Sequence, residues 1–212
     1  AKGKSALALA LKKKIGSNDE IQKVTHWIDT GFPPLNKAIS GRYDGGFPCG
    51  RIVEVFGPPS AGKTFLATAA MISAQKQDGL AVFLDHENSF DVGLAVANGL
   101  NADEDDGQWV YKQPDTFEDS VELIGTILKL VRDEELIPES APICIVADSL
   151  ASMVPNSKAE KFEKMAEGTA KDKDQLNMND NTALARATSA NFPTLALWAR
   201  KYNACIIFLN QV

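Results

Sequence analysis

The stretch RIVEVFGPPSAGKTFLATAAMISAQKQ, residues 51–77, joins a short apolar run to a helical one through a turn of small residues. The run 51–56 is typical of a buried strand, and the alanine-rich run from Lys63 predicts a helix that stops at Gly79. The turn between them, residues 57–64, fits the pattern G-x-x-x-x-G-K-[ST] at every fixed position. Because a strand precedes the turn and a helix follows it, the sequence predicts a phosphate-binding loop.

Each kind of residue in this loop suits a different part of a phosphate chain. The glycines at 57 and 62 let the backbone approach a ligand, and the N–H groups around residues 60–62 can point into one concavity beside the helix start. Lys63 offers a cation for the β- and γ-phosphates, and Thr64 offers a hydroxyl to Mg²⁺. Because a predicted strand precedes the pattern and a predicted helix follows it, a chance match is disfavoured. The predicted nucleotide-binding residues are Gly57, Pro58, Pro59, Ser60, Ala61, Gly62, Lys63, Thr64 and Phe65.

The composition of the whole chain limits the classes of protein to which it can belong. With 212 residues and 44% hydrophobic content, the sequence predicts one sizeable core. Three scattered cysteines and two histidines favour neither a disulfide framework nor a structural zinc site. No apolar stretch approaches the roughly 18 residues of a membrane span, so we expect a soluble, cytoplasmic protein without a membrane partner. The net charge of −6 disfavours a surface that is basic throughout, but a local basic track would suffice for nucleic acid.

Four more apolar runs, residues 80–85, 109–113, 141–148 and 204–211, are typical of buried strands. Helical stretches lie between them, including 116–134, in which Thr116 is the predicted N-cap. Alternating strands and helices predict an α/β fold whose mostly parallel sheet is flanked by helices. Ligands bind beyond the carboxyl ends of such strands.

The N-terminal residues predict a short helical arm. Residues 3–14 are rich in alanine and leucine and end in Lys12, Lys13 and Lys14, which suits a helix C-terminus. This helix either packs on its own core or docks on a neighbouring subunit, and the long polar connection after it favours docking. We therefore expect an arm and linker over residues 1–32 and a core over residues 33–212; the family resemblance given below implies that this core is an ATPase, truncated after the last strand.

Asp148 ends the run 143–148, where a carboxylate can hold Mg²⁺ through a coordinated water. Strands also end in aspartate for reasons of capping alone. Given the phosphate-binding loop, the metal role is the better interpretation.

Five segments resemble the RecA family of homologous recombinases, in order and approximate spacing. They are GGFPCGRIVEVFGPPSAGKT, FLDHENSFD, QPDTFEDS, IVADSLASMVP and IIFLNQ, within residues 30–212. Many variable positions depart from bacterial forms, which favours a phage-encoded member.

The resemblance implies roles for particular residues. Glu87 matches the glutamate that orients the water attacking the γ-phosphate, which agrees with its place just beyond a strand. Asp91 matches a contact to the adenine amino group, and Leu94 stands where bacterial members stack a tyrosine on the base. Gln211 matches the glutamine that senses the γ-phosphate. Nearby, Asp85 is interpreted as a packing or capping residue and His86 as structural.

The DNA-binding residues come mainly from the same resemblance. Arg186 and Ser189 match positions that touch the DNA backbone, and a guanidinium and a hydroxyl both suit phosphate oxygens. Residues 156–180 carry paired charges that are typical of a solvated helix face or a mobile loop, although the family's first DNA-binding loop occupies this region. Residues 182–203 predict a helix that Pro193 kinks or divides, and Trp198 is interpreted as core.

The function implied is ATP- and Mg²⁺-dependent recombination. Such a protein forms a filament on single-stranded DNA, pairs it with a homologous duplex, and hydrolyses ATP in response to DNA. Single-strand-binding and loader proteins are expected partners. Two alternatives remain, a helicase or other motor with the same fold and a non-catalytic recombination mediator. Retained Lys63, Thr64, Glu87 and Asp148 argue against the mediator.

Overall fold

The computed structural model describes residues 2–15, 23–106, 108–169 and 182–211. Its centre is a five-stranded sheet with the order β3-β7-β6-β4-β5, in which all neighbouring strands are parallel. The strands are β3 (Arg51–Gly57), β4 (Leu80–Asp85), β5 (Trp109–Lys112), β6 (Ile143–Asp148) and β7 (Ala204–Gln211). The predicted α/β fold with a parallel sheet is confirmed.

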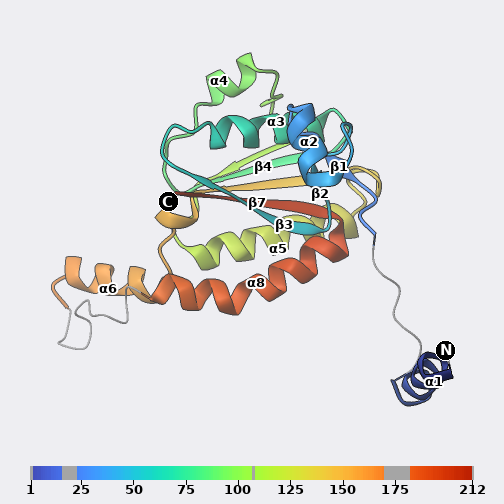
Figure 1. The fold of residues 1–212 in the computed structure, drawn as a ribbon. Helices are drawn as coiled ribbons and strands as arrows, with labels where there is room; N and C mark the ends of the chain where they lie inside the picture. The colour runs from blue at the N-terminus through green and yellow to red at the C-terminus, as the bar shows by residue number, and fades with distance from the viewer. Residues whose placement is uncertain (1, 16–22, 107, 170–181, 212) are drawn as a thin grey trace.

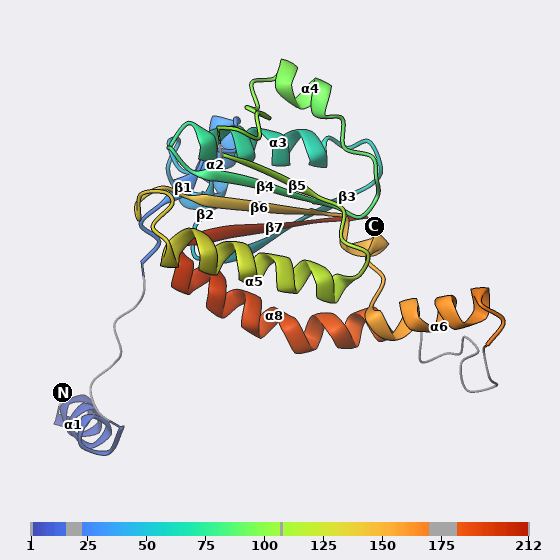
Figure 2. The ribbon, with the colours of Figure 1, turned by 180° about the vertical axis from the view of Figure 1, so that it is seen from behind.

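Helices cover both faces of this sheet (Figures 1 and 2). On one face lies α3 (Lys63–Gln75), with α2 (Pro33–Ser40) and α4 (Val92–Ala97) on the same side. On the other face lie α5 (Phe117–Asp133) and α8 (Ala183–Tyr202). The three central strands are buried on both faces, which explains why their sequences read as continuous apolar runs.

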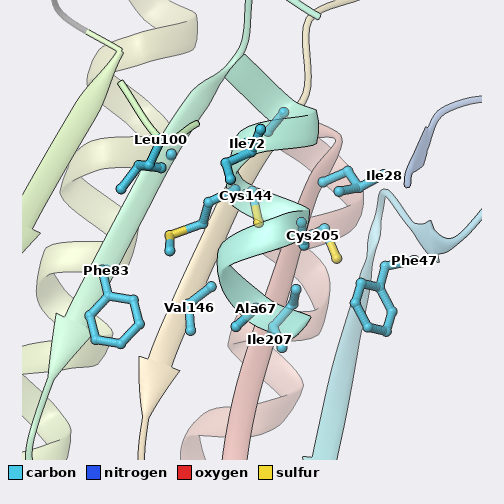
Figure 3. Packing of buried hydrophobic residues seen from close by; sticks show 14 of the residues in the cluster. Ile28, Phe47, Ala67, Ile72, Phe83, Leu100, Cys144, Val146, Cys205 and Ile207 are labelled. Atoms are coloured by element: carbon cyan, nitrogen blue, oxygen red, sulfur yellow. The ribbon is translucent and has the colours of Figure 1, made fainter. Parts of the chain in front are cut away.

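The cores on the two sides of the sheet consist of aliphatic and aromatic side chains. Figure 3 shows the cluster under α3, where Phe83, Val146 and Ile207 from three strands pack with Ala67 and Ile72 of the helix. All three cysteines, Cys49, Cys144 and Cys205, are buried in this cluster as free thiols. Burial raises the pKa of Cys49 to about 12, so its thiol stays protonated at neutral pH.

Helix α5 has Thr116 as its N-cap, as the sequence predicts, and the structure shows a capping box there. Thr116 Oγ1 accepts a hydrogen bond from Asp119 N at 3.1 Å, and the Asp119 carboxylate accepts one from Thr116 N at 3.0 Å. Two backbone donors at the helix start are thereby satisfied. The cap also anchors the helix whose far side packs against the sheet and α8.

Replacing Thr116 with alanine is expected to lower the free energy of unfolding by about 1 kcal/mol, since one capping acceptor is lost. Urea denaturation followed by circular dichroism would measure this change. The matched control is Thr126→Ala at an exposed position of the same helix, which should be neutral or slightly stabilising. Equal effects of the two substitutions would contradict the capping role.

Helix α8 is continuous through Pro193, so the predicted start of a second helix at this residue is wrong, whereas the predicted kink stays a prediction. Proline removes one backbone hydrogen bond, and the packing of the helix against α5 and the sheet offsets the loss. Trp198 packs against this core, as predicted. Its ring fills the space beside Gly125, where a Cβ atom would lie 2.7 Å from Trp198 Cη2.

The other elements of the described residues lie outside the five-stranded sheet and the helices on its faces. They are α1 (Lys2–Ile15), β1 (Trp27–Ile28), β2 (Phe47–Pro48), the 3₁₀ turn η1 (Leu150–Ser152) and α6 (Asn156–Ala166). Strands β1 and β2 pair antiparallel. Ile28 of β1 is buried in the core cluster under α3, although it lies within the predicted arm and linker. The division at residue 32 stays a prediction, and residues 16–22 of that linker lie outside the described residues. Across the described residues, no helix has both the length and the apolar character of a membrane span.

Candidate nucleotide-binding site

The register of the sheet brings several predicted site residues together at the edge formed by the carboxyl ends of the strands. Gly57 is paired with Gln211, and Asp85 is paired with Asp148, each at the carboxyl end of its strand. The phosphate-binding loop, residues 57–64, starts at the first of these pairs, and the segment with Glu87 starts at the second. This edge is the place where parallel α/β sheets bind ligands.

The phosphate-binding loop is held by its own backbone and by Lys63. Gly62 has φ 86° and Ser60 has φ 60°, left-handed values that turn the chain sharply into α3. Lys63 Nζ donates hydrogen bonds to Gly57 O at 3.0 Å and to Pro58 O at 2.9 Å. The ammonium group therefore lies over the loop, beside the N-terminal end of α3, where an anion would be attracted.

Thr64 and Asp148 form a pair of oxygen ligands across the loop. Thr64 Oγ1 donates to Asp148 Oδ2 at 3.1 Å, and Asp148 is almost fully buried. Burial, together with the nearby Glu87 carboxylate, raises the pKa of Asp148 to about 6, while the hydrogen bond from Thr64 opposes this shift. A hydroxyl and a carboxylate are the donors that Mg²⁺ accepts beside nucleotide phosphates, so the pair fits this cation.

Glu87 lies at the centre of a small polar cluster. Its Oε1 atom accepts hydrogen bonds from Gln211 Nε2 at 2.8 Å, from Ser152 Oγ at 2.9 Å and from Ser149 Oγ. Ser149 and Ser152 also contact each other at 3.1 Å. Three donors thus fix one carboxylate oxygen, whereas no hydrogen bond joins Glu87 Oε2 to another residue of the described ranges.

Ser149 and Ser152 are the two residues of this cluster that have no role predicted from the sequence. Ser149 follows Asp148 directly, so its place at a strand end was a usable signal. Ser152 gives no such signal, since only the turn η1 returns its side chain toward Glu87.

Asp85 organises the backbone of the loop after β4 and agrees with its interpretation as a packing or capping residue. Its carboxylate accepts hydrogen bonds from Glu87 N at 3.1 Å, Phe90 N at 3.1 Å and Tyr111 Oη at 2.9 Å. These bonds fix the segment on which Glu87 stands.

His86 points away from the cluster around Glu87, as its structural interpretation expects. Its Nε2 atom lies 2.6 Å from Ser120 Oγ on α5. Burial lowers the pKa of His86, while the carboxylates of Asp85 and Asp119 oppose that shift. This contact joins the loop to α5.

Asp91 borders a cavity of about 220 Å³ between α3 and α4. The cavity begins at Thr64, next to the phosphate-binding loop, and its other lining residues are Phe65, Thr68, Ser89, Phe90, Leu94, Ala95 and Asn98. Asp91 Oδ1 caps α4 by accepting a hydrogen bond from Leu94 N at 2.8 Å. The structure therefore brings Asp91 and Phe65 to one cavity.

Arg186 and Ser189 do not belong to this site. Both are exposed on α8, which lies on the opposite face of the sheet from α3, and they are one helical turn apart (Figure 2). The charged segment before them forms the exposed helix α6, while residues 170–181 lie outside the described residues.

The chain is similar in sequence to known proteins of one family. A family model described as the RecA N-terminal domain matches residues 9–212. Relatives named Protein RecA include those of Desulforapulum autotrophicum, 35% identical over 201 residues, and Treponema denticola, 36% identical over 199 residues. Each alignment covers 94% of this chain, but only 48% and 41% of the respective relative. The chain thus spans about half the length of the curated relatives that it matches.

Proposed function

Because the chain belongs to the RecA family, we propose that it is the nucleotide-binding part of an ATP-dependent DNA recombinase. In this proposal the protein assembles on single-stranded DNA with ATP and Mg²⁺, pairs that strand with a homologous duplex, and hydrolyses ATP in response to DNA. One observation supports this proposal above the others. At the carboxyl ends of the parallel strands, the sheet brings together Lys63, Asp148, Glu87 and Gln211. Phage origin and the expected loader and single-strand-binding partners stay predictions.

The residues at the carboxyl ends of the strands have different roles in the proposed phosphoryl transfer. The backbone of residues 57–64 and Lys63 bind the phosphates, and Thr64 and Asp148 would hold Mg²⁺. When bound, the cation would neutralise charge on the phosphate oxygens. The three bonds to Glu87 Oε1 keep the carboxylate oriented, so that Oε2 can position water and accept its proton.

Gln211 is proposed to report the state of the phosphate. Its amide donates to Glu87 Oε1 at 2.8 Å and stands at the end of β7, next to the first glycine of the loop. An amide that exchanges Glu87 for a phosphate oxygen would shift the carboxyl end of β7. The Gln211 side chain would then have two positions, and bound nucleotide would change the population of each.

The DNA and subunit contacts are proposed for other surfaces. Arg186 and Ser189 form an exposed pair suited to phosphate oxygens. Helix α1 has exposed apolar side chains, with Leu7 61% and Leu9 69% exposed, which supports docking of residues 1–32 on a neighbouring subunit.

The test combines ATP hydrolysis with electron microscopy of mixtures containing ATP and DNA. We expect single-stranded DNA to stimulate hydrolysis and to promote helical filaments. Closed rings with directional strand separation would instead indicate a motor of the same fold. DNA binding without any hydrolysis would indicate a mediator, and either result would overturn the proposal.

A further inference from the structure

We infer that Phe65, supported by Phe32, is a base-stacking residue that clamps a purine ring against Leu94. This inference rests on the proposed function, because it concerns the base of the nucleotide whose phosphates occupy residues 57–64. It assigns Phe65 a contact different from the phosphate contacts predicted for the loop.

The position of the cavity makes it the natural place for a base. Thr64 and Phe65 are in the first turn of α3, directly after the phosphate-binding loop, and both line the 220 Å³ cavity. A nucleotide with its phosphates at the N-terminal end of α3 can reach this space through its ribose. The opposite side of the cavity is formed by α4.

The lining of the cavity combines apolar faces with polar groups at the edge. Phe65 is 50% exposed and Leu94 is 59% exposed, and neither belongs to the two buried core clusters of the described residues. Asp91 and Asn98 also line the cavity. Asp91 Oδ1 is used to cap α4, and no bond joins its Oδ2 to another described residue. A purine has apolar faces and hydrogen-bonding edges, so it complements this arrangement.

Phe32 supports the ring of Phe65 from outside the cavity lining. The two ring centroids are 6.4 Å apart with an interplanar angle of 63°, an edge-to-face contact. Phe32 is itself positioned by a buried network, since Phe32 N donates to Thr30 Oγ1 at 3.2 Å and Thr30 Oγ1 donates to Asn36 Oδ1 at 2.7 Å. Thr30 and Asn36 are almost fully buried. The support reduces the ordering cost of stacking a base on Phe65.

The test compares two ligands that share phosphates but differ in the base. Phe65→Ala should weaken ATP binding about tenfold, which corresponds to about 1.4 kcal/mol, as expected for one lost stacking contact. Binding of inorganic tripolyphosphate should stay within about twofold, which also shows that the variant is folded. Phe65→Trp should retain ATP affinity, and Phe65→Leu should fall between wild type and alanine. Calorimetry with Mg²⁺ present would measure these affinities for the three variants and for the wild-type protein.

The control is Phe56→Ala, which removes a 66% exposed phenylalanine outside the cavity lining and should leave both affinities unchanged. Unchanged ATP affinity in Phe65→Ala would overturn the stacking role, and so would an equal loss for ATP and tripolyphosphate. If wild-type protein bound neither ligand, the proposed function itself would fail. A change in subunit association with unchanged ATP affinity would make Phe65 an interface residue and would also overturn the inference.

Discussion

Replacing Lys63 with alanine is expected to weaken ATP binding by at least about a hundredfold. The ammonium group lies over the phosphate-binding loop through hydrogen bonds to Gly57 O and Pro58 O. It can transfer these donors to the β- and γ-phosphates, where charge-assisted bonds contribute roughly 1.5–3 kcal/mol each. Alanine removes both the donors and the positive charge. Isothermal titration with ATP and Mg²⁺ would measure the change.

Lys76→Ala is the matched control for this substitution. Lys76 is exposed just beyond the C-terminal end of α3, so its removal changes the net charge equally without touching the loop. We expect Lys76→Ala to bind ATP with nearly wild-type affinity. Wild-type affinity in Lys63→Ala would instead contradict the assignment of residues 57–64 as the phosphate site.

Replacing Glu87 with glutamine is expected to reduce ATP turnover by about 10²–10⁴-fold while ATP binding is retained. Glutamine preserves a side-chain oxygen that can accept the bonds from Ser149, Ser152 and Gln211, so the cluster around this position should persist. It cannot accept a proton from water as a carboxylate does. Steady-state phosphate release in the presence of single-stranded DNA, with nucleotide affinity measured separately, would separate the two effects.

Glu122→Gln provides the control for the loss of one acidic group. Glu122 is exposed on α5, and its substitution should leave turnover unchanged. If Glu87→Gln hydrolysed ATP at the wild-type rate, Glu87 would not be the residue that positions water. A large loss of ATP affinity would indicate that it binds nucleotide instead.

Much of the fold was predictable because its signals are local. The strands are apolar runs bounded by turn residues, and Thr116 with Asp119 three positions later marks the start of α5. Strands β1 and β2 were missed, since two-residue strands carry no periodicity. At Pro193 a local rule predicts the start of a second helix, whereas α8 continues through this residue.

The candidate site was predictable only where its residues are contiguous or recognisable by resemblance. The loop 57–64 is a complete motif, whereas Glu87 and Gln211 were identified mainly by resemblance. Their meeting depends on strand register, which pairs the ends of β3 and β7 and the ends of β4 and β6. Ser152 could not be identified from the sequence, because its contact with Glu87 depends on a turn distant in sequence from that residue.

The most direct test of the central claim is a crystal structure of the protein with Mg²⁺ and a non-hydrolysable ATP analogue. We expect the triphosphate to lie in the loop 57–64, with Lys63 Nζ moved from the carbonyls of Gly57 and Pro58 onto the phosphates. An analogue bound elsewhere, with Lys63 still bonded to both carbonyls, would contradict the assignment of this loop as the phosphate site.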